Sequence, residues 1–274
     1  MANEPVTLFG LSEPVFRMGV FLAAFFLFSA LEALAPRRPR LQSRLKRWTT
    51  NTAMLVIATG LVRALVLIAP LLAMTAAAGL AGQLGWGLFN LTGLPIWLEI
   101  CLAIMFLDLA IWLQHLISHK VPFIWRFHRV HHADRDLDAS SALRFHPIEI
   151  AGSAAYKLGV VFLLGPSALA AVLFEVLLNA SAMFNHANLA MPRGLDRILR
   201  SVLVTPDMHR VHHSIHRREH DSNYGFCLSI WDRMFRTYRA QPEGGHQGMT
   251  IGLAEHQTSK TQALSWSLKL PIQQ

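Results

Sequence analysis

Long apolar runs separated by short polar segments dominate the chain. The first run covers residues 15–35, about the length that an α-helix needs to cross a bilayer, and Pro36 follows it. A second run extends from residue 49 to about residue 80 with Arg63 as its only charge, and a third covers residues 94–113. Each of the three runs predicts a membrane-spanning helix.

A fourth apolar stretch, residues 150–184, is interrupted by Gly165 and Pro166. A Gly-Pro pair is a turn signal, so the stretch predicts a hairpin of two short spans or a re-entrant pair. Its two ends then lie on the same side of the membrane. The remainder from about residue 188 contains no spanning run and is expected to fold with residues 120–149.

The pattern predicts an all-α, integral membrane helical protein with about four spanning or re-entrant units and a cytoplasmic, histidine-rich helical cap. Two spans and a basic loop form an N-terminal part, residues 1–92, and residues 241–274 form a polar C-terminal tail. The first 14 residues carry no basic segment before their apolar stretch, so we expect no cleaved signal peptide.

Composition and charge agree with a membrane protein. Hydrophobic residues make up 53% of the 274 residues, charged residues 15%, and the formal net charge is +8. Six basic residues and no acid lie between Arg37 and Arg47, whereas residues 64–119 contain no Lys or Arg. A solvated loop explains the first segment, and the positive-inside rule makes it cytoplasmic. Residues 79–95 then lie on the outer side, and no nucleic-acid partner is expected.

The histidines carry the chemistry. The pentapeptide His-Arg-Val-His-His occurs at residues 128–132 and again at 209–213, and His115 and His119 precede the first copy. Positions i, i+3 and i+4 share one face of a helix, so each pentapeptide can converge on one point. Neutral imidazole binds Zn, Cu, Fe and Ni. Eight candidate ligands are too many for one ion, so two are expected. Cys101 and Cys227 form no metal motif.

These motifs resemble the fatty acid hydroxylase superfamily, which includes sterol desaturases, sterol methyl oxidases and alkylglycerol monooxygenase. The family pattern is H-x(3–4)-H, then H-x-x-H-H, then a later motif in which His or Gln is followed by x-x-H-H. Further matches lie at residues 141–149, 185–188, 205–209, 223–225 and 230–235. The resemblance covers about residues 95–240, defines a hydroxylase-type domain at 93–240, and is greatest to bacterial members labelled sterol desaturase.

The resemblance implies a di-iron oxygenase that uses O2 and external electrons to hydroxylate or desaturate a C–H bond of a lipid of the sterol, fatty acyl or alkyl-ether class. It implies two iron ions, which zinc can replace in purified protein. The electrons must come from a separate ferredoxin, cytochrome or reductase, because the chain has no flavin, cytochrome or ferredoxin motif of its own. The expected location is the bacterial inner membrane, with the site facing the cytoplasm. Hydroxylation, desaturation and ether cleavage stay open.

The predicted metal ligands, which are also the catalytic groups, are His115, His119, His128, His131, His132, His186, His209, His212 and His213. No other cofactor-binding residue is expected. Further candidates for a metal contact, or for a hydrogen bond to a ligand, are His146, Glu149, Asp207, Asn185 and Asn188. Asp207 is the preferred partner of a ligand, and Asp134, Asp136, Asp138 and Asp232 are alternatives.

Other polar residues receive simpler interpretations. Arg129 and Arg210 are expected to pair with these acids. Asp108, in the third apolar run, faces either the site or another helix, because a charge in lipid is costly. Surface positions are predicted for His216 and His220, and ordinary tail positions for His246 and His256.

Two other functions fit a histidine-rich membrane protein. A membrane metal-binding or metal-transport protein is one, but transporters bind ions near the bilayer midplane, whereas most of these histidines lie outside the apolar runs. A non-catalytic scaffold is the other. Buried histidines without a metal would be costly, which disfavours it.

Overall fold

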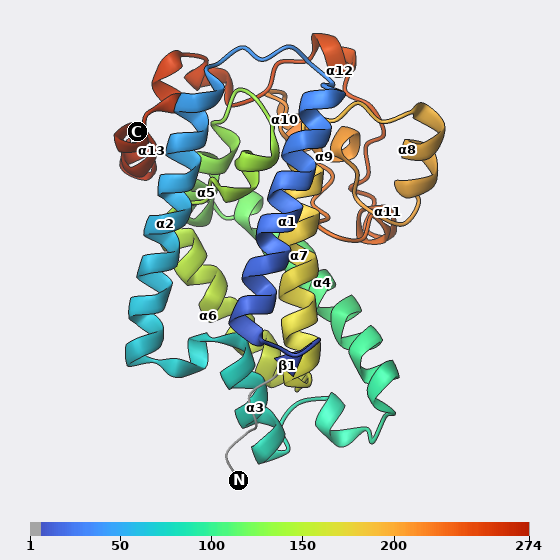
Figure 1. Cartoon of the computed structure of the whole chain (residues 1–274). Helices are drawn as coiled ribbons and strands as arrows, with labels where there is room; N and C mark the ends of the chain where they lie inside the picture. The colour runs from blue at the N-terminus through green and yellow to red at the C-terminus, as the bar shows by residue number, and fades with distance from the viewer. Residues whose placement is uncertain (1–6, 274) are drawn as a thin grey trace.

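The computed structural model describes residues 7–273, and most of them lie in helices (Figure 1). Among these residues the only strands form a short hairpin of β1 (Thr7–Leu8) and β2 (Leu11–Ser12). The prediction about a signal peptide falls partly on residues 1–6, which lie outside the described residues.

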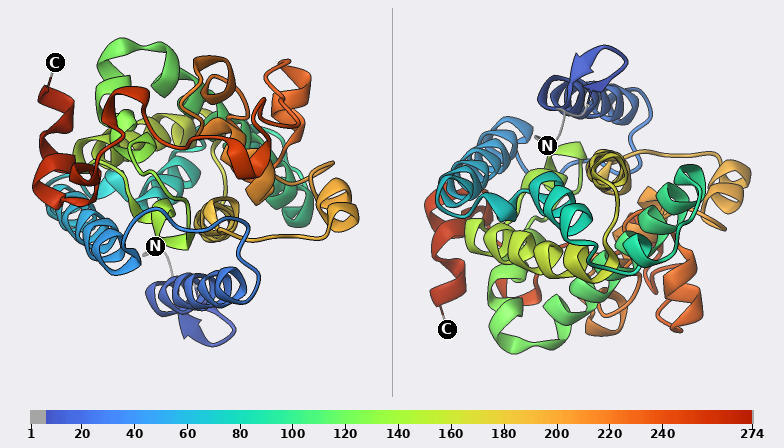
Figure 2. Two further views of the ribbon diagram at one scale, coloured as in Figure 1. Left: turned by 90° about the horizontal axis from the view of Figure 1, so that it is seen from above. Right: turned by 90° about the horizontal axis from the view of Figure 1, so that it is seen from below.

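Within the described chain, five helices are long and apolar enough to cross a membrane. They are α1 (Glu13–Leu34), α2 (Arg44–Ile68), α4 (Ile96–Lys120), α6 (Pro147–Leu164) and α7 (Ala168–His186). The all-α membrane fold is therefore confirmed, and the predicted hairpin is the pair α6 and α7. Figure 2 shows α1 at the edge of the bundle in both views.

The second apolar run does not form one helix. Helix α2 ends at Ile68, and Pro70 begins a short turn, η1 (Pro70–Leu72), before a separate helix, α3 (Met74–Leu84). Proline lacks the N–H that continues a helix and disfavours helical backbone in the residue before it. The prediction of a single span over residues 49–80 was therefore too long. After α3, the turn η2 (Phe89–Leu91) leads to α4.

The α6–α7 turn depends on a close glycine contact. Gly165 ends α6 with φ +63°, and a Cβ added at Gly87 would lie 2.3 Å from the Gly165 nitrogen. Ser167 then caps α7, and the Glu99 carboxylate of α4 accepts hydrogen bonds from the Ser167 backbone N–H and hydroxyl at 2.9 Å. These contacts hold the turn at the end of the bundle opposite His146 and His186.

The basic segment that leads into α2, residues 37–47, is a clamp rather than a solvated loop. Arg47 is buried and donates to Asp134 at 2.7 Å and to Asp138 at 2.5 Å. Arg38 donates to the carbonyls of His246 and Met249 at 2.7 and 2.6 Å. A buried ion pair is satisfied only when each charge has good partners, and Arg47 has two carboxylates and a carbonyl.

Short helices and turns form a cap at one end of the long helices. They are α5 (Pro122–His132), η3 (Ala139–Leu143), α8 (Arg193–Leu199), α9 (Pro206–His212), α10 (Arg217–His220), α11 (Ile230–Met234), α12 (Gly245–Gly248), η4 (Ala254–His256), η5 (Ser259–Gln262), α13 (Leu264–Lys269) and η6 (Leu270–Ile272).

Residues 241–273 of the polar C-terminal segment pack on the other elements as part of this cap. Leu270 is fully buried in a cluster with Met54 of α2 and Val130 of α5. Arg144 donates to the Thr261 carbonyl at 2.7 Å and to the Ser267 hydroxyl at 2.8 Å. Figure 2 shows the segment crossing the bundle when seen from above. His246, expected to be an ordinary tail residue, is buried.

Candidate metal centre

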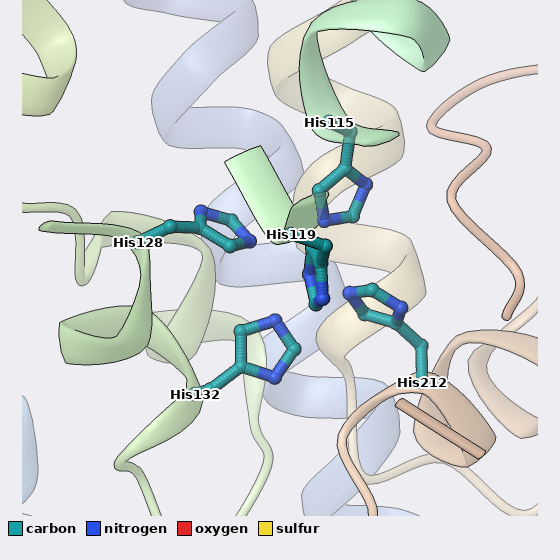
Figure 3. A group of neighbouring side chains, drawn as sticks. All are labelled: His115, His119, His128, His132 and His212. Atoms are coloured by element: carbon teal, nitrogen blue, oxygen red, sulfur yellow. The ribbon is translucent and has the colours of Figure 1, made fainter. Parts of the chain in front are cut away.

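The nine predicted ligands form two groups. The first contains His115, His119, His128, His132 and His212, and the second contains His131, His186, His209 and His213. In each group the candidate ligand atoms lie within 4.8 Å of one another. Figure 3 shows the rings of the first group turned toward a common centre.

Each pentapeptide serves both groups, so the expectation that it converges on one point is wrong. In α5, His128 and His132 enter the first group and His131 enters the second. In α9 the arrangement is reversed, because His212 belongs to the first group and His209 to the second. Side chains at positions i and i+4 of a helix point in directions that differ by only about 40°. Those at positions i+3 and i+4, which are consecutive, differ by about 100°. The i, i+4 pair therefore stays together and the third ring points to the neighbouring group.

Hydrogen bonds at Nδ1 orient three of the five rings of the first group. The Nδ1 atoms of His115 and His212 lie 2.7 Å from the carbonyls of Tyr224 and Ser222. His128 Nδ1 lies 2.6 Å from a Glu149 oxygen. Each contact fixes the proton on Nδ1 and leaves Nε2 as the free acceptor. The Nε2 atoms of all three are buried and have no partner, a cost that a bound ion would remove.

Nitrogen spacings in the second group match a coordination sphere. His186 Nδ1 lies 2.6 Å from the Ala182 carbonyl, and its Nε2 lies 3.0 Å from the Nε2 atoms of both His131 and His209. The Nε2 atoms of His209 and His213 are 3.2 Å apart. Two nitrogens about 2.1 Å from one ion and at right angles around it are about 3.0 Å apart. The donor set therefore fits a first-row transition metal.

The surroundings keep these imidazoles neutral. Burial, and then repulsion from neighbouring imidazoles, lowers the pKa of His131, His132, His209 and His213 well below the ordinary value. Burial also lowers the pKa of His212. Neutral imidazole is the form that binds metals, so the cluster is already in its ligand form at neutral pH.

The carboxylate beside a ligand is Glu149, not the preferred Asp207. Asp207 instead accepts hydrogen bonds from Arg37 at 3.0 Å and from Arg210. The imidazole beside it is that of His246, whose Nε2 lies 3.5 Å from an Asp207 oxygen. The predicted pairing of Arg210 with an acid is confirmed. Arg129 differs, because it donates at 2.6 Å to the carbonyls of Leu270 and Gln273.

Three other candidates lie outside both groups. His146 caps α6 by accepting from the Ile148 backbone N–H at 3.2 Å. Asn188 holds the backbone of the basic clamp. Its side chain accepts a hydrogen bond from the Arg38 N–H at 3.1 Å and donates one to the Arg38 carbonyl at 2.9 Å. Asn185 donates to the Phe226 carbonyl at 2.6 Å and has a buried oxygen without a partner.

The remaining acids support the framework. Asp134 and Asp138 pair with Arg47, and Asp136 accepts from the Leu41 N–H at 3.0 Å. Asp232 accepts at 2.8 Å from the backbone N–H groups of Tyr224 and Gly225, and so holds the carbonyl that orients His115.

One residue near the first group was assigned wrongly to the surface. His220 is half-buried, stacks on Trp125 with ring centroids 5.6 Å apart, and forms a third potential ligand set with His119 and Asp221. Burial lowers its pKa. Its position seven residues after His213 was the only sequence signal. His216 is exposed, as predicted, and the ring of His256 lies 5.1 Å from that of Trp266.

Comparison with known proteins gives a consistent assignment. The family model described as fatty acid hydroxylase matches residues 100–237, about half of the chain. Alkylglycerol monooxygenase of Caenorhabditis elegans is 35% identical over 141 residues, which cover 50% of this chain and 26% of that protein. Ornithine lipid hydroxylase OlsE of Rhizobium tropici is 29% identical over 149 residues, covering 54% of this chain and 44% of that protein.

Human cholesterol 25-hydroxylase is 26% identical over 140 residues, covering 51% of this chain and 50% of that protein. The chain therefore spans between about a quarter and half of the length of these curated relatives. No solved structure matches the chain.

Proposed function

This chain belongs to the fatty acid hydroxylase family, and from that premise we propose that it is a membrane-bound hydroxylase of lipids whose two histidine groups each hold one iron ion. The observation that carries the proposal is the pair of adjacent buried groups, nine imidazoles in all, whose inner nitrogens converge at ligand spacing. Iron held there would supply the activation of O2, with two electrons from an external donor.

The chain's own residues would keep this site dry and fixed. Phe145 stacks on His131 with ring centroids 4.3 Å apart, and Phe226 lies 5.0 Å from the His115 ring. These aromatic rings cover part of the site, while the carbonyl of Tyr224 and the Glu149 carboxylate hold the outer nitrogens of His115 and His128. The ligands are thus positioned before a metal binds, which lowers the cost of assembling the site.

A lipid is the substrate class that these features favour. The site lies at the ends of α4 and α7, two helices long and apolar enough to cross a bilayer, so an alkyl chain can approach from the membrane. The three relatives are named for an alkylglycerol, an ornithine lipid and cholesterol. Their names favour hydroxylation, and desaturation of the same C–H bond is the alternative outcome. Metal transport is disfavoured because the ligands form buried groups and four of the nine are held in place by hydrogen bonds to backbone carbonyls or to Glu149.

The proposed location is the inner membrane of a bacterium, with the site on the cytoplasmic side, where a ferredoxin, cytochrome or reductase can deliver electrons. Lys120, the last residue of α4, and the basic segment that leads into α2 support this orientation under the positive-inside rule.

The test combines metal content with isotope incorporation. Protein reconstituted anaerobically in nanodiscs should bind about two irons per chain, matching the two groups. With a reducing system, 18O2 and membrane lipids, mass spectrometry should detect 18O in a lipid product. Exposed His216→Ala is the matched control and should retain both properties. Two bound irons without any oxidised lipid would reject the oxygenase, and protein that binds no iron would reject the metal assignment.

A further inference from the structure

Part of the cap lies along the side of α4 rather than beyond its end. Asp108 accepts hydrogen bonds from the backbone N–H groups of Cys227 and Leu228 at 3.1 and 3.0 Å, and from Trp231 Nε1 at 2.9 Å. Twelve residues separate Asp108 from Lys120, the last residue of α4, which corresponds to about 18 Å along the helix axis. The segment that begins at Cys227 therefore docks far from the aqueous end of a spanning helix.

The docking continues through α11. Phe235 stacks on Trp112 with ring centroids 4.5 Å apart, and Trp112 Nε1 donates to Asp232 at 3.1 Å. Trp231 packs in the same cluster as Leu109. Irregular backbone can lie at membrane depth only where protein satisfies its polar groups, and the Asp108 carboxylate satisfies two of these N–H groups.

This unit and the segment beside it also carry exposed apolar residues. Helix α8 joins it because Leu203 pairs with Leu228 and the Ser229 N–H donates to the Val202 carbonyl at 2.9 Å. Figure 1 shows α8 and α11 on the same side of the bundle. We call the exposed apolar residues of these two helices, and of the residues that follow each of them, the α8–α11 face. It consists of Leu195, Ile198, Val202, Leu203, Ile230, Met234 and Phe235.

The exposure of these residues and the charges beside them indicate their environment. Ile198 is 70% exposed and Met234 is 59% exposed, although neither belongs to a spanning helix. Contiguous exposed apolar residues on a soluble surface mark an interaction site. Arg193, Arg197 and Arg236 are exposed in the same two segments. A combination of apolar side chains and arginines is typical of helices that lie in a membrane interface.

We propose that the α8–α11 face is embedded in one leaflet of the bilayer, with its apolar side chains among the acyl chains and its arginines at anionic phospholipid headgroups. The face belongs to a segment that docks on α4 through Asp108 and Trp112, and its arginines are complementary in charge to an anionic leaflet. The cap is then partly a monotopic membrane element, and Asp108 anchors it. The inference does not depend on bound iron or on the proposed reaction.

Spin-label depth measurements in nanodiscs test this arrangement. The full chain, with Cys101→Ser and Cys227→Ser, receives one label at a time through Ile198→Cys or Met234→Cys in bilayers of phosphatidylcholine and phosphatidylglycerol. Leu22→Cys on the exposed side of α1 is the lipid reference, and Arg218→Cys on exposed α10 is the aqueous reference. Power saturation compares access by oxygen, which concentrates in lipid, with access by a water-soluble nickel chelate.

Both test labels should be more accessible to oxygen than to nickel, as at Leu22, and should lie about 5–10 Å below the phosphates. Nickel access equal to that at Arg218 would overturn the proposal. Shielding from both reagents, together with dipolar coupling between labels on two chains, would also overturn it by assigning the face to a second copy. Val202→Cys is a third position on the same face, should either variant fail to fold.

Discussion

Replacing Glu149 with Gln separates the charge of this side chain from its shape. The Glu149 oxygen lies 2.6 Å from His128 Nδ1, and both side chains are buried, 8% and 2% exposed. Glutamine keeps a carbonyl oxygen that can accept the Nδ1 proton, but it loses the negative charge. A carboxylate partner raises the basicity of a ligating imidazole, so the substitution should weaken metal binding by the first group.

The contact sets the magnitude. A hydrogen bond to a charged group contributes about 1.5–3 kcal/mol and a neutral one about 0.5–1.5 kcal/mol, so Glu149→Gln should cost about 1–1.5 kcal/mol. That cost corresponds to roughly a tenfold loss of affinity, the lower end of the range for partners of metal ligands. Glu149→Ala should lose more, because it leaves the buried Nδ1–H of His128 without an acceptor.

Anaerobic titration of iron(II) against a competing chelator measures both groups. Glu149→Gln should weaken one of two sites about tenfold and leave the other unchanged. The control is Glu243→Gln, the same substitution at a side chain that is 67% exposed. Unchanged affinity in Glu149→Gln would refute the reasoning. Complete loss of one iron would also refute it, since the buried free oxygen of Glu149 would then be a ligand itself.

Three further predictions address the ligands, the anchor and pH. His131→Ala and His212→Ala should each remove about one iron, from the second and first group respectively, with turnover lost and the membrane helices still folded by circular dichroism; full iron content in either variant contradicts its ligand role. Asp108→Ala strands three buried donors at about 1–3 kcal/mol each and should lower the melting temperature far more than Asp108→Asn, which keeps one acceptor; equal melting temperatures would argue against the anchor. Metal-free protein should lose stability as pH falls below about 6.5, because the unfolded chain then binds more protons than the folded chain. The loss is up to about 1.4 kcal/mol per pH unit for each buried histidine whose folded-state pKa is lowered. A melting temperature that stays constant from pH 7.5 to 5.5 contradicts this.

The apolar runs along the chain were sufficient to predict the long helices, because a helix that crosses a bilayer needs about 20 apolar residues. The same signal could not place the end of α2, where Pro70 interrupts a run that stays apolar on both sides. Repeated histidine spacing selected eight of the nine residues that the structure brings together, and the match at residues 185–188 added His186. It could not divide them between two groups, because the division depends on how α4, α5, α7 and α9 are oriented around one another.

Charged residues were predicted least well, because their partners lie far away in the sequence. Asp207 was preferred for its position two residues before His209, yet Arg37 reaches it from 170 positions away. Glu149 reaches His128 across 21 positions, from the first turn of a helix that begins at Pro147. Sequence proximity to a ligand is therefore a poor guide to hydrogen bonding with it. The direction of each helix decides which carboxylate faces the imidazole.

Arg37 and Arg47, in the basic segment that leads into α2, have one role during membrane insertion and another in the folded protein. In the folded chain Arg47 is buried against Asp134 and Asp138, and Arg37 is paired with Asp207, so these charges are neutralised. The positive-inside rule acts during insertion, when basic residues close to a spanning segment set its orientation. Asp134 lies 87 positions after Arg47, so the acids follow much later in synthesis. Arg37 and Arg47 are thus unpaired when orientation is chosen and paired once the cap closes. Their burial in the final fold therefore does not weaken the prediction that this end of the bundle is cytoplasmic.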